Sequence, residues 1–125
     1  MKTNGNIKRY LQLNTKYVKD TEECLTKDDY VQASEKSWGA YATILKAIAA
    51  QRRKTIKTHE GLSFFTAEIA RELKDQDVNG ICLVADGLHQ NFYENNQHPD
   101  AVKKGAKIIK QFVTRMRNRF KLDKL

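Results

Sequence analysis

Hydrophobic residues recur along the chain at alternating steps of three and four, which is the spacing of one face of an α-helix. The clearest stripe, with Asp28 ahead of it as a candidate cap, consists of Val31, Ser34, Trp38, Tyr41, Leu45 and Ile48. The last segment has the same spacing, at Val102, Ala106, Ile109, Val113, Met116 and Phe120. The pattern therefore predicts two long amphipathic helices, the second beginning at the sequence His-Pro-Asp, residues 98–100.

Three further stripes complete the pattern. They run through Ile7, Leu11, Asn14, Val18, Thr21 and Leu25, then through Leu62, Phe65, Ile69 and Leu73 after Gly61, and then through Val78, Ile81, Ala85, Leu88 and Phe92. The connections around 26–28, 74–77 and 95–98 are short, and short connections place consecutive helices antiparallel. Only residues 52–61 form a longer polar joint. We predict an all-α protein, an antiparallel bundle of four to five helices, with residues 1–125 as a single helical domain.

Composition narrows the class of protein. The chain is 40% hydrophobic and 30% charged, and it contains no apolar run near the roughly 20 residues that span a bilayer. The N-terminal residues also lack the apolar stretch of a signal peptide, so we expect a cytoplasmic protein with no membrane partner. Cys24 and Cys82 lie far apart and have no partner at metal-ligand spacing, which favours free thiols over a disulfide or a metal site.

The net charge of +8 is concentrated at the C-terminal end. Residues 102–125 contain nine cations and one acid, whereas residues 1–101 are neutral overall. Such a segment attracts phosphate, which makes RNA or a nucleotide a possible partner; it is equally compatible with a solvated helix face. The candidate binding residues in this segment are Lys103, Lys104, Lys107, Lys110, Arg115, Arg117 and Arg119.

The sequence ADGLHQNFYENN, residues 85–96, contains a second candidate site. On a helix, His89 falls at the border of the apolar stripe, with Asp86 three residues before it and Tyr93 four residues after it on the same edge. A carboxylate one turn from an imidazole fixes its tautomer and raises its pKa, as a general acid or base near neutral pH requires. The alternative is a boundary histidine with no chemical role.

Two neighbours of His89 fall elsewhere on the predicted helix. Phe92 belongs to the core stripe, and Asn91 lies on the opposite flank, where we include it as a candidate binding residue. No second histidine stands four residues from His89 and no acidic cluster accompanies it, so neither a metal site nor a cofactor is predicted. Neither cysteine has a histidine at a recognisable spacing, and no glycine-rich phosphate loop is present.

Three blocks of the chain resemble a known family. They are DDYVQASEKSWGAYATILKAIAAQR, THEGLSFF and LHQNFYEN, the last followed by a helix that begins with proline. Together they resemble the archaeal PaREP family, a branch of the HEPN-like superfamily of helical proteins. The most specific features are the spacing of Tyr30, Ala33 and Trp38 and the block from His89 to Glu94 ahead of Pro99. The resemblance implies an all-helical antiparallel bundle, commonly a homodimer, in a family whose members largely lack an assigned activity.

Other branches of the HEPN superfamily include metal-independent ribonucleases, often with a nucleotidyltransferase partner protein. Their signature is an arginine followed by a histidine after four to six residues; the histidine handles the 2′-hydroxyl proton and the arginine stabilises the developing negative charge. This chain has no arginine between Arg71 and His89. Arg52 and Arg53 precede His59 by the required number of residues, but on a predicted helix end and the loop after it, where the spacing can also arise by chance.

Two functions therefore stay open. The first, which the missing arginine favours, is a non-catalytic HEPN-like module, dimeric, that binds RNA, a nucleotide or a partner protein through the His89 edge and the basic last helix. The alternative is a metal-independent ribonuclease that uses His89, with Asp86 and Tyr93, or His59, with Arg53, as its acid or base.

Overall fold

The structure, a computed structural model, describes residues 2–124, with side chains described from Asn6 onward. Five α-helices follow one another in this part of the chain, and a short 3₁₀ helix, η1 (Leu122–Lys124), ends it. The helices are α1 (Lys2–Thr26), α2 (Tyr30–Gln51), α3 (His59–Leu73), α4 (Asp77–Glu94) and α5 (Pro99–Arg119). The predicted all-α bundle is thus confirmed.

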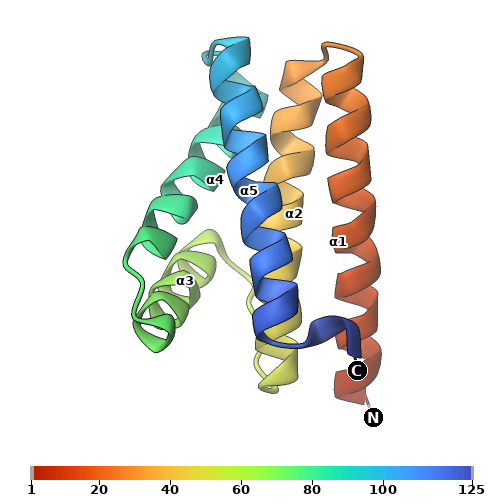
Figure 1. The fold of residues 1–125 in the computed structure, drawn as a ribbon, viewed down its shortest axis with the longest axis vertical. Coiled ribbons are helices and arrows are strands. Elements are labelled where there is room, and N and C mark those ends of the chain that lie inside the picture. Colours follow the sequence, from red (N-terminus) through yellow and green to blue (C-terminus); the bar gives the residue numbers. More distant parts are fainter. Residues whose placement is uncertain (1, 125) are drawn as a thin grey trace.

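The helix α2 lies at the centre of the bundle and packs against α1, α4 and α5 (Figure 1). Consecutive long helices run antiparallel, α1 with α2 and α4 with α5, and the shorter α3 packs against α4. Small residues allow α1 to approach α2 closely: a Cβ on Gly39 would lie 2.9 Å from carbon atoms of the Tyr17 ring. The predicted stripes form the core, where Tyr41, Ile69 and Leu88 are buried.

Two helix starts differ from the predictions. The cap of α2 is Asp29, whose side chain accepts a hydrogen bond from the Gln32 N–H at 3.1 Å, whereas Asp28 lies in the connection with a φ of 56°. The helix α3 begins at His59 and not after Gly61, because the Thr58 hydroxyl accepts from the Gly61 N–H at 2.9 Å and so caps the first turn. His59 therefore belongs to a helix and not to a loop.

A buried polar contact joins α1 both to α2 and to α5. The Asn14 side-chain amide donates to the Ala40 carbonyl at 2.6 Å and to the Thr43 hydroxyl at 3.1 Å. The Asn14 oxygen in turn accepts from the guanidinium of Arg117 at 3.1 Å, and Arg117 also donates to the Leu11 carbonyl at 2.9 Å. Arg117 is therefore held inside the fold, which makes it a structural residue and not the surface cation that the charge pattern predicted.

No helix within the described residues is long and apolar enough to cross a membrane.

Candidate functional site

The imidazole of His89 lies in a group of aromatic rings contributed by three helices. It stacks on the Trp38 ring, with centroids 4.4 Å apart and planes 27° apart, and it meets the His59 ring edge to face at 4.8 Å. The Tyr93 ring stands at 90° to His89, with centroids 5.3 Å apart, and Trp38 meets His59 at 5.0 Å. We call these four residues, together with Glu35, the histidine cluster. It brings together two imidazoles that are separated by a whole helix in the sequence.

The carboxylate beside His89 is Glu35 of α2. The Nδ1 atom of His89 lies 2.8 Å from Oε1 of Glu35, and the two side chains are 21% and 27% exposed. If Nδ1–H donates to the carboxylate, the imidazole is held with Nε2 free to accept or deliver a proton. Asp86, the predicted partner, is exposed, and its carboxylate accepts from the Cys82 thiol at 3.8 Å. Asp86 is therefore not the partner of His89, because the His89 side chain packs against α2 and not along α4.

Local structure holds each ring in place. Glu35 and Trp38 stand three residues apart on α2 and so share one face of that helix, the face that meets α4 at His89. The Thr58 cap fixes the first turn of α3 and with it the position of His59. Tyr93 lies one turn after His89 on α4 and is 70% exposed. The cluster therefore has a half-buried floor and an exposed aromatic rim.

Two lysines lie beside the cluster. A hollow of about 280 Å³ adjoins His59, and its lining residues are Trp38, Lys46, Lys57, Thr58, His59 and Leu62. Lys46 comes from α2 and Lys57 from the connection before α3, so two lysines line this hollow together with His59. Neither lysine was predicted to belong to a site. The i, i+3 pair of Glu35 and Trp38 was the one signal that could have indicated this face.

The arginines that precede His59 have other surroundings. Arg52 forms ion pairs with Glu72 at 2.8 Å and with Glu68 at 3.8 Å, both on α3. Arg53 is exposed just after α2, with a φ of 60°. Arg52 and Arg53 therefore have the predicted spacing from His59 in the sequence, but neither makes a described contact with the imidazole of His59 or His89.

Asn91 lies inside the protein. Its side-chain amide donates to the Ser34 hydroxyl at 2.9 Å, and its oxygen accepts from the Gln97 N–H at 2.7 Å. Both polar groups are thus used to fasten the end of α4 to α2 and to the connection before α5. This burial leaves no polar atom of Asn91 at the surface, so the predicted binding role is replaced by a structural one. Phe92, expected in the core, is only partly buried.

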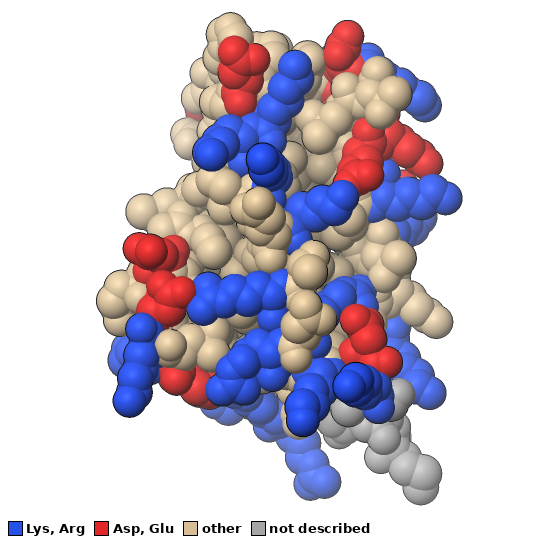
Figure 2. All heavy atoms as spheres, in the orientation of Figure 1, with Lys and Arg blue, Asp and Glu red and all other residues tan. Residues whose placement is uncertain are grey.

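Many of the predicted cations of α5 are engaged by other parts of the bundle. Lys110 pairs with Glu22, Arg115 pairs with Asp75 at 2.8 Å, and the Lys103 ammonium lies 5.6 Å from the centre of the Tyr30 ring. Arg119 lies over the neighbouring Phe120 ring, and Lys104 and Lys107 are exposed. Figure 2 shows lysines and arginines gathered over the lower half of the face drawn, with carboxylates among them.

The described contacts of the α5 cations do not include any residue of the histidine cluster. We predicted one binding surface formed by His89 and the basic last helix. The structure has two separate features instead, the histidine cluster and the cations of α5. Within the same described residues, no group of three or more histidine, cysteine, aspartate or glutamate side chains is placed to hold a metal ion. The two described cysteines, Cys24 and Cys82, are free thiols.

The fold and the cluster define a class of protein: a helical bundle whose central helix carries a carboxylate and an indole against two imidazoles. A family model described as the archaeal PaREP1/PaREP8 family matches residues 9–113, and the chain belongs to this family. The matched range contains every residue of the histidine cluster. A search of curated proteins finds no match to the chain.

Proposed function

We propose that this protein is a HEPN-like helical module that binds single-stranded RNA at the histidine cluster. The observation that carries the proposal is the position of Lys46 and Lys57 in the hollow beside His59, next to exposed aromatic surface. Proteins that bind single strands combine cations that track the phosphates with aromatic rings on which bases stack. The histidine cluster supplies the rings, and the adjoining hollow supplies the cations.

Tyr93 is the residue best placed to stack on a base. Tyr93 is 70% exposed, and its ring makes edge contacts with His89 and Phe92. Trp38, by contrast, contacts both imidazoles, at 5.0 Å and 4.4 Å between ring centres, and so helps to fix their positions. Stacking on an exposed aromatic ring tolerates any base, so we expect affinity for RNA with little sequence preference.

Lys46 and Lys57 would contact the phosphates. Each neutralised phosphate releases counterions, so binding should weaken steeply as salt is added. The α5 cations contribute less than their number suggests, because Lys110, Arg115 and Arg117 already have partners within the bundle. This assignment moves the expected phosphate contacts from the last helix to α2 and the connection after it.

A metal-independent ribonuclease is the second candidate function, and the observation in its favour is the second imidazole. Cleavage of RNA needs a base that removes the 2′-hydroxyl proton and an acid that protonates the leaving 5′-oxygen. His59 and His89 lie 4.8 Å apart between ring centres, and Glu35 supports one of them. Lysine ammonium groups in place of the arginine would stabilise the negative charge that develops at phosphorus.

One experiment tests both functions. Labelled single-stranded RNA is incubated in chelator with the native protein and with His59→Ala, His89→Ala and Tyr93→Ala, after each variant has been shown to fold. We expect salt-sensitive binding that Tyr93→Ala weakens by about fivefold or more. The control is Gln90→Ala, which shortens an exposed side chain of the same helix outside the cluster.

The outcomes separate the two functions. Binding without cleavage excludes the ribonuclease. Cleavage that is lost in either histidine variant excludes the non-catalytic module. If the native protein neither binds nor cleaves RNA, the proposal fails, and a nucleotide or a partner protein becomes the ligand to test.

We further propose that the module is a homodimer. Phe64 and Leu83 are 69% and 74% exposed, which leaves apolar side chains that a second copy could cover. The mass of one chain is 14.4 kDa, and light scattering in solution should give twice that mass. A monomeric mass at all concentrations measured would contradict this part of the proposal.

A further inference from the structure

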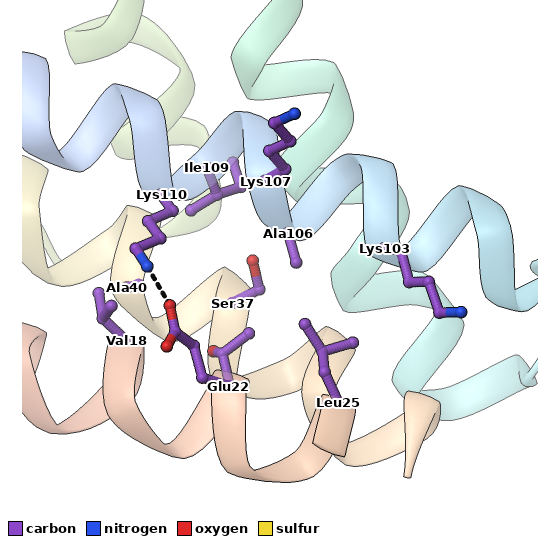
Figure 3. A pocket seen from close by; sticks show the side chains of 11 residues that line it. Val18, Glu22, Leu25, Ser37, Ala40, Lys103, Ala106, Lys107, Ile109 and Lys110 are labelled. Atoms are coloured by element: carbon purple, nitrogen blue, oxygen red, sulfur yellow. Dashed lines mark hydrogen bonds and ion pairs between the residues drawn. The ribbon is translucent and has the colours of Figure 1, made fainter. Parts of the chain in front are cut away.

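A second hollow lies between α1, α2 and α5, away from the histidine cluster (Figure 3). Its volume is about 280 Å³, and most of its lining is aliphatic. The apolar residues that line it include Val18, Leu25, Ala40, Ala106 and Ile109. No tryptophan, tyrosine or phenylalanine lines it, so nothing in it can stack on a nucleobase. We call it the Ser37 cavity after the residue described next.

Ser37 is the unusual residue of this cavity. Its side chain is 1% exposed, and its hydroxyl has no hydrogen-bond partner among the described residues. In Figure 3 the side chain rises from α2 toward Ala106 of α5, into the cavity. A buried hydroxyl without a partner is unfavourable, and buried polar groups in native proteins are normally paired. Ser37 therefore places an unused donor at the wall of the cavity.

Cations stand around the cavity. Lys103, Lys107 and Lys110 line it from α5, at steps of four and three that place them on one side of that helix. Lys110 reaches across to Glu22 of α1 (Figure 3). Lys107, unlike Lys110, Arg115 and Arg117, forms no ion pair within the described residues. Glu22 also lines the cavity and offsets one of these three cations, so an anion there would still lie in a net positive potential while its body contacts aliphatic side chains.

We propose that the Ser37 cavity binds an aliphatic carboxylate, a short or medium-chain fatty acid. One carboxylate oxygen accepts a hydrogen bond from Ser37, Lys103 and Lys107 balance the charge because Lys110 is already paired with Glu22, and the hydrocarbon chain packs against the apolar lining. All three kinds of group line the same space, so one ligand can contact them together. The proposal is independent of RNA binding at the histidine cluster.

The test measures octanoate binding to the native protein by calorimetry, below the concentration at which octanoate forms micelles. We expect saturable binding that tightens by about fourfold for each methylene added from butanoate to octanoate. Octanol, which has no charge, should bind at least tenfold more weakly. No saturable binding of octanoate, equal binding of octanol, or comparable binding of adenosine monophosphate would each overturn the proposal.

Variants with matched controls locate the ligand. Ala106→Leu fills the cavity and should abolish binding, whereas Ala101→Leu, an exposed position on the same helix, should not. Lys107→Gln should weaken binding, and Lys104→Gln, outside the cavity, should leave it unchanged. Binding that survives Ala106→Leu, or that responds equally to both lysine variants, would contradict the assignment.

The variant Ser37→Ala distinguishes a serine that binds the ligand from a serine that only stabilises the fold. Because the hydroxyl has no partner in the free protein, its removal should leave the unfolding midpoint unchanged or raise it. The same change should weaken octanoate binding by about tenfold, the loss expected for one hydrogen bond to a charged group. A lower unfolding midpoint with unchanged octanoate affinity would show that Ser37 serves the fold alone.

Discussion

Replacement of Arg117 by methionine should weaken the attachment of α1 to the rest of the bundle. The guanidinium donates to the Leu11 carbonyl at 2.9 Å, to the Asn14 oxygen at 3.1 Å and to the Thr15 hydroxyl at 3.0 Å, all on α1. It also pairs with Asp123 in the C-terminal turn. Methionine keeps much of the apolar stem and removes every one of these donors.

The structure sets the size of the loss. Asn14 is fully buried, so loss of its donor leaves a buried oxygen unpaired, which costs about 1–3 kcal/mol. The bonds to Leu11 and Thr15 are at the edge of the contact, where water can replace the guanidinium, and they add about 1 kcal/mol together. The free energy of unfolding should therefore fall by about 2–4 kcal/mol, a large part of the usual total of about 5–15 kcal/mol.

Urea unfolding followed by circular dichroism measures this change as a shift in midpoint at unchanged slope. The control is Arg119→Met, two residues on in α5, where the side chain is exposed and contacts the neighbouring Phe120 ring; it should cost less than about 1 kcal/mol. Arg117→Lys keeps the charge but not the planar set of donors and should recover only part of the loss. Equal, small losses in both methionine variants would refute the structural role of Arg117.

Three further changes test the packing. Gly39→Ala should destabilise the protein by about 1–2 kcal/mol, because the added Cβ would press on the Tyr17 ring. Gly80→Ala has open space around it and should stabilise the protein by about 0.5–1 kcal/mol. Opposite results in urea unfolding would contradict the packing of α1 on α2. Tyr41→Phe removes a buried hydrogen bond of 2.6 Å to Thr66 and should cost about 1 kcal/mol. Burial raises the pKa of Tyr41, so native stability should fall above about pH 10, where the unfolded tyrosine ionises; a Tyr41→Phe protein that loses just as much stability there would count against this.

The apolar stripes predicted the helices because burial follows the 3.6-residue period directly, as it does for Tyr41 and Leu88. The first residue of a helix is harder to predict from the apolar stripes. Gly61 looked like the end of a joint, yet the Thr58 cap carries the first turn of α3 over it. A cap depends on one local hydrogen bond, which periodicity does not encode.

The candidate site was predicted only in part. His89 and Tyr93 were correctly placed on one edge of α4, since both follow from helix geometry. Glu35 and His59 were not linked to that edge, because their contacts with His89 join residues on different helices. One sequence shows helical neighbours three or four residues apart and cannot show which helix packs against that face.

The same limit applies to charge. Counting cations indicated the last helix, but pairing depends on what lies opposite each side chain, and Arg117 faces buried acceptors on α1. Lys46 is surrounded in the sequence by buried residues of α2, and nothing in this pattern indicates that it lines a hollow beside His59.

The salt dependence of RNA binding tests the central proposal most directly. The affinity for a labelled single-stranded RNA is measured from low to moderate salt for the native protein, for the double variant Lys46→Gln with Lys57→Gln, and for Lys104→Gln as a control. If the two lysines contact one phosphate each, the double variant should reduce the slope of log affinity against log salt by about 1.4, and the control should leave the slope unchanged. A slope that is unchanged in the double variant and reduced in the control would place RNA on the last helix and contradict binding at the histidine cluster.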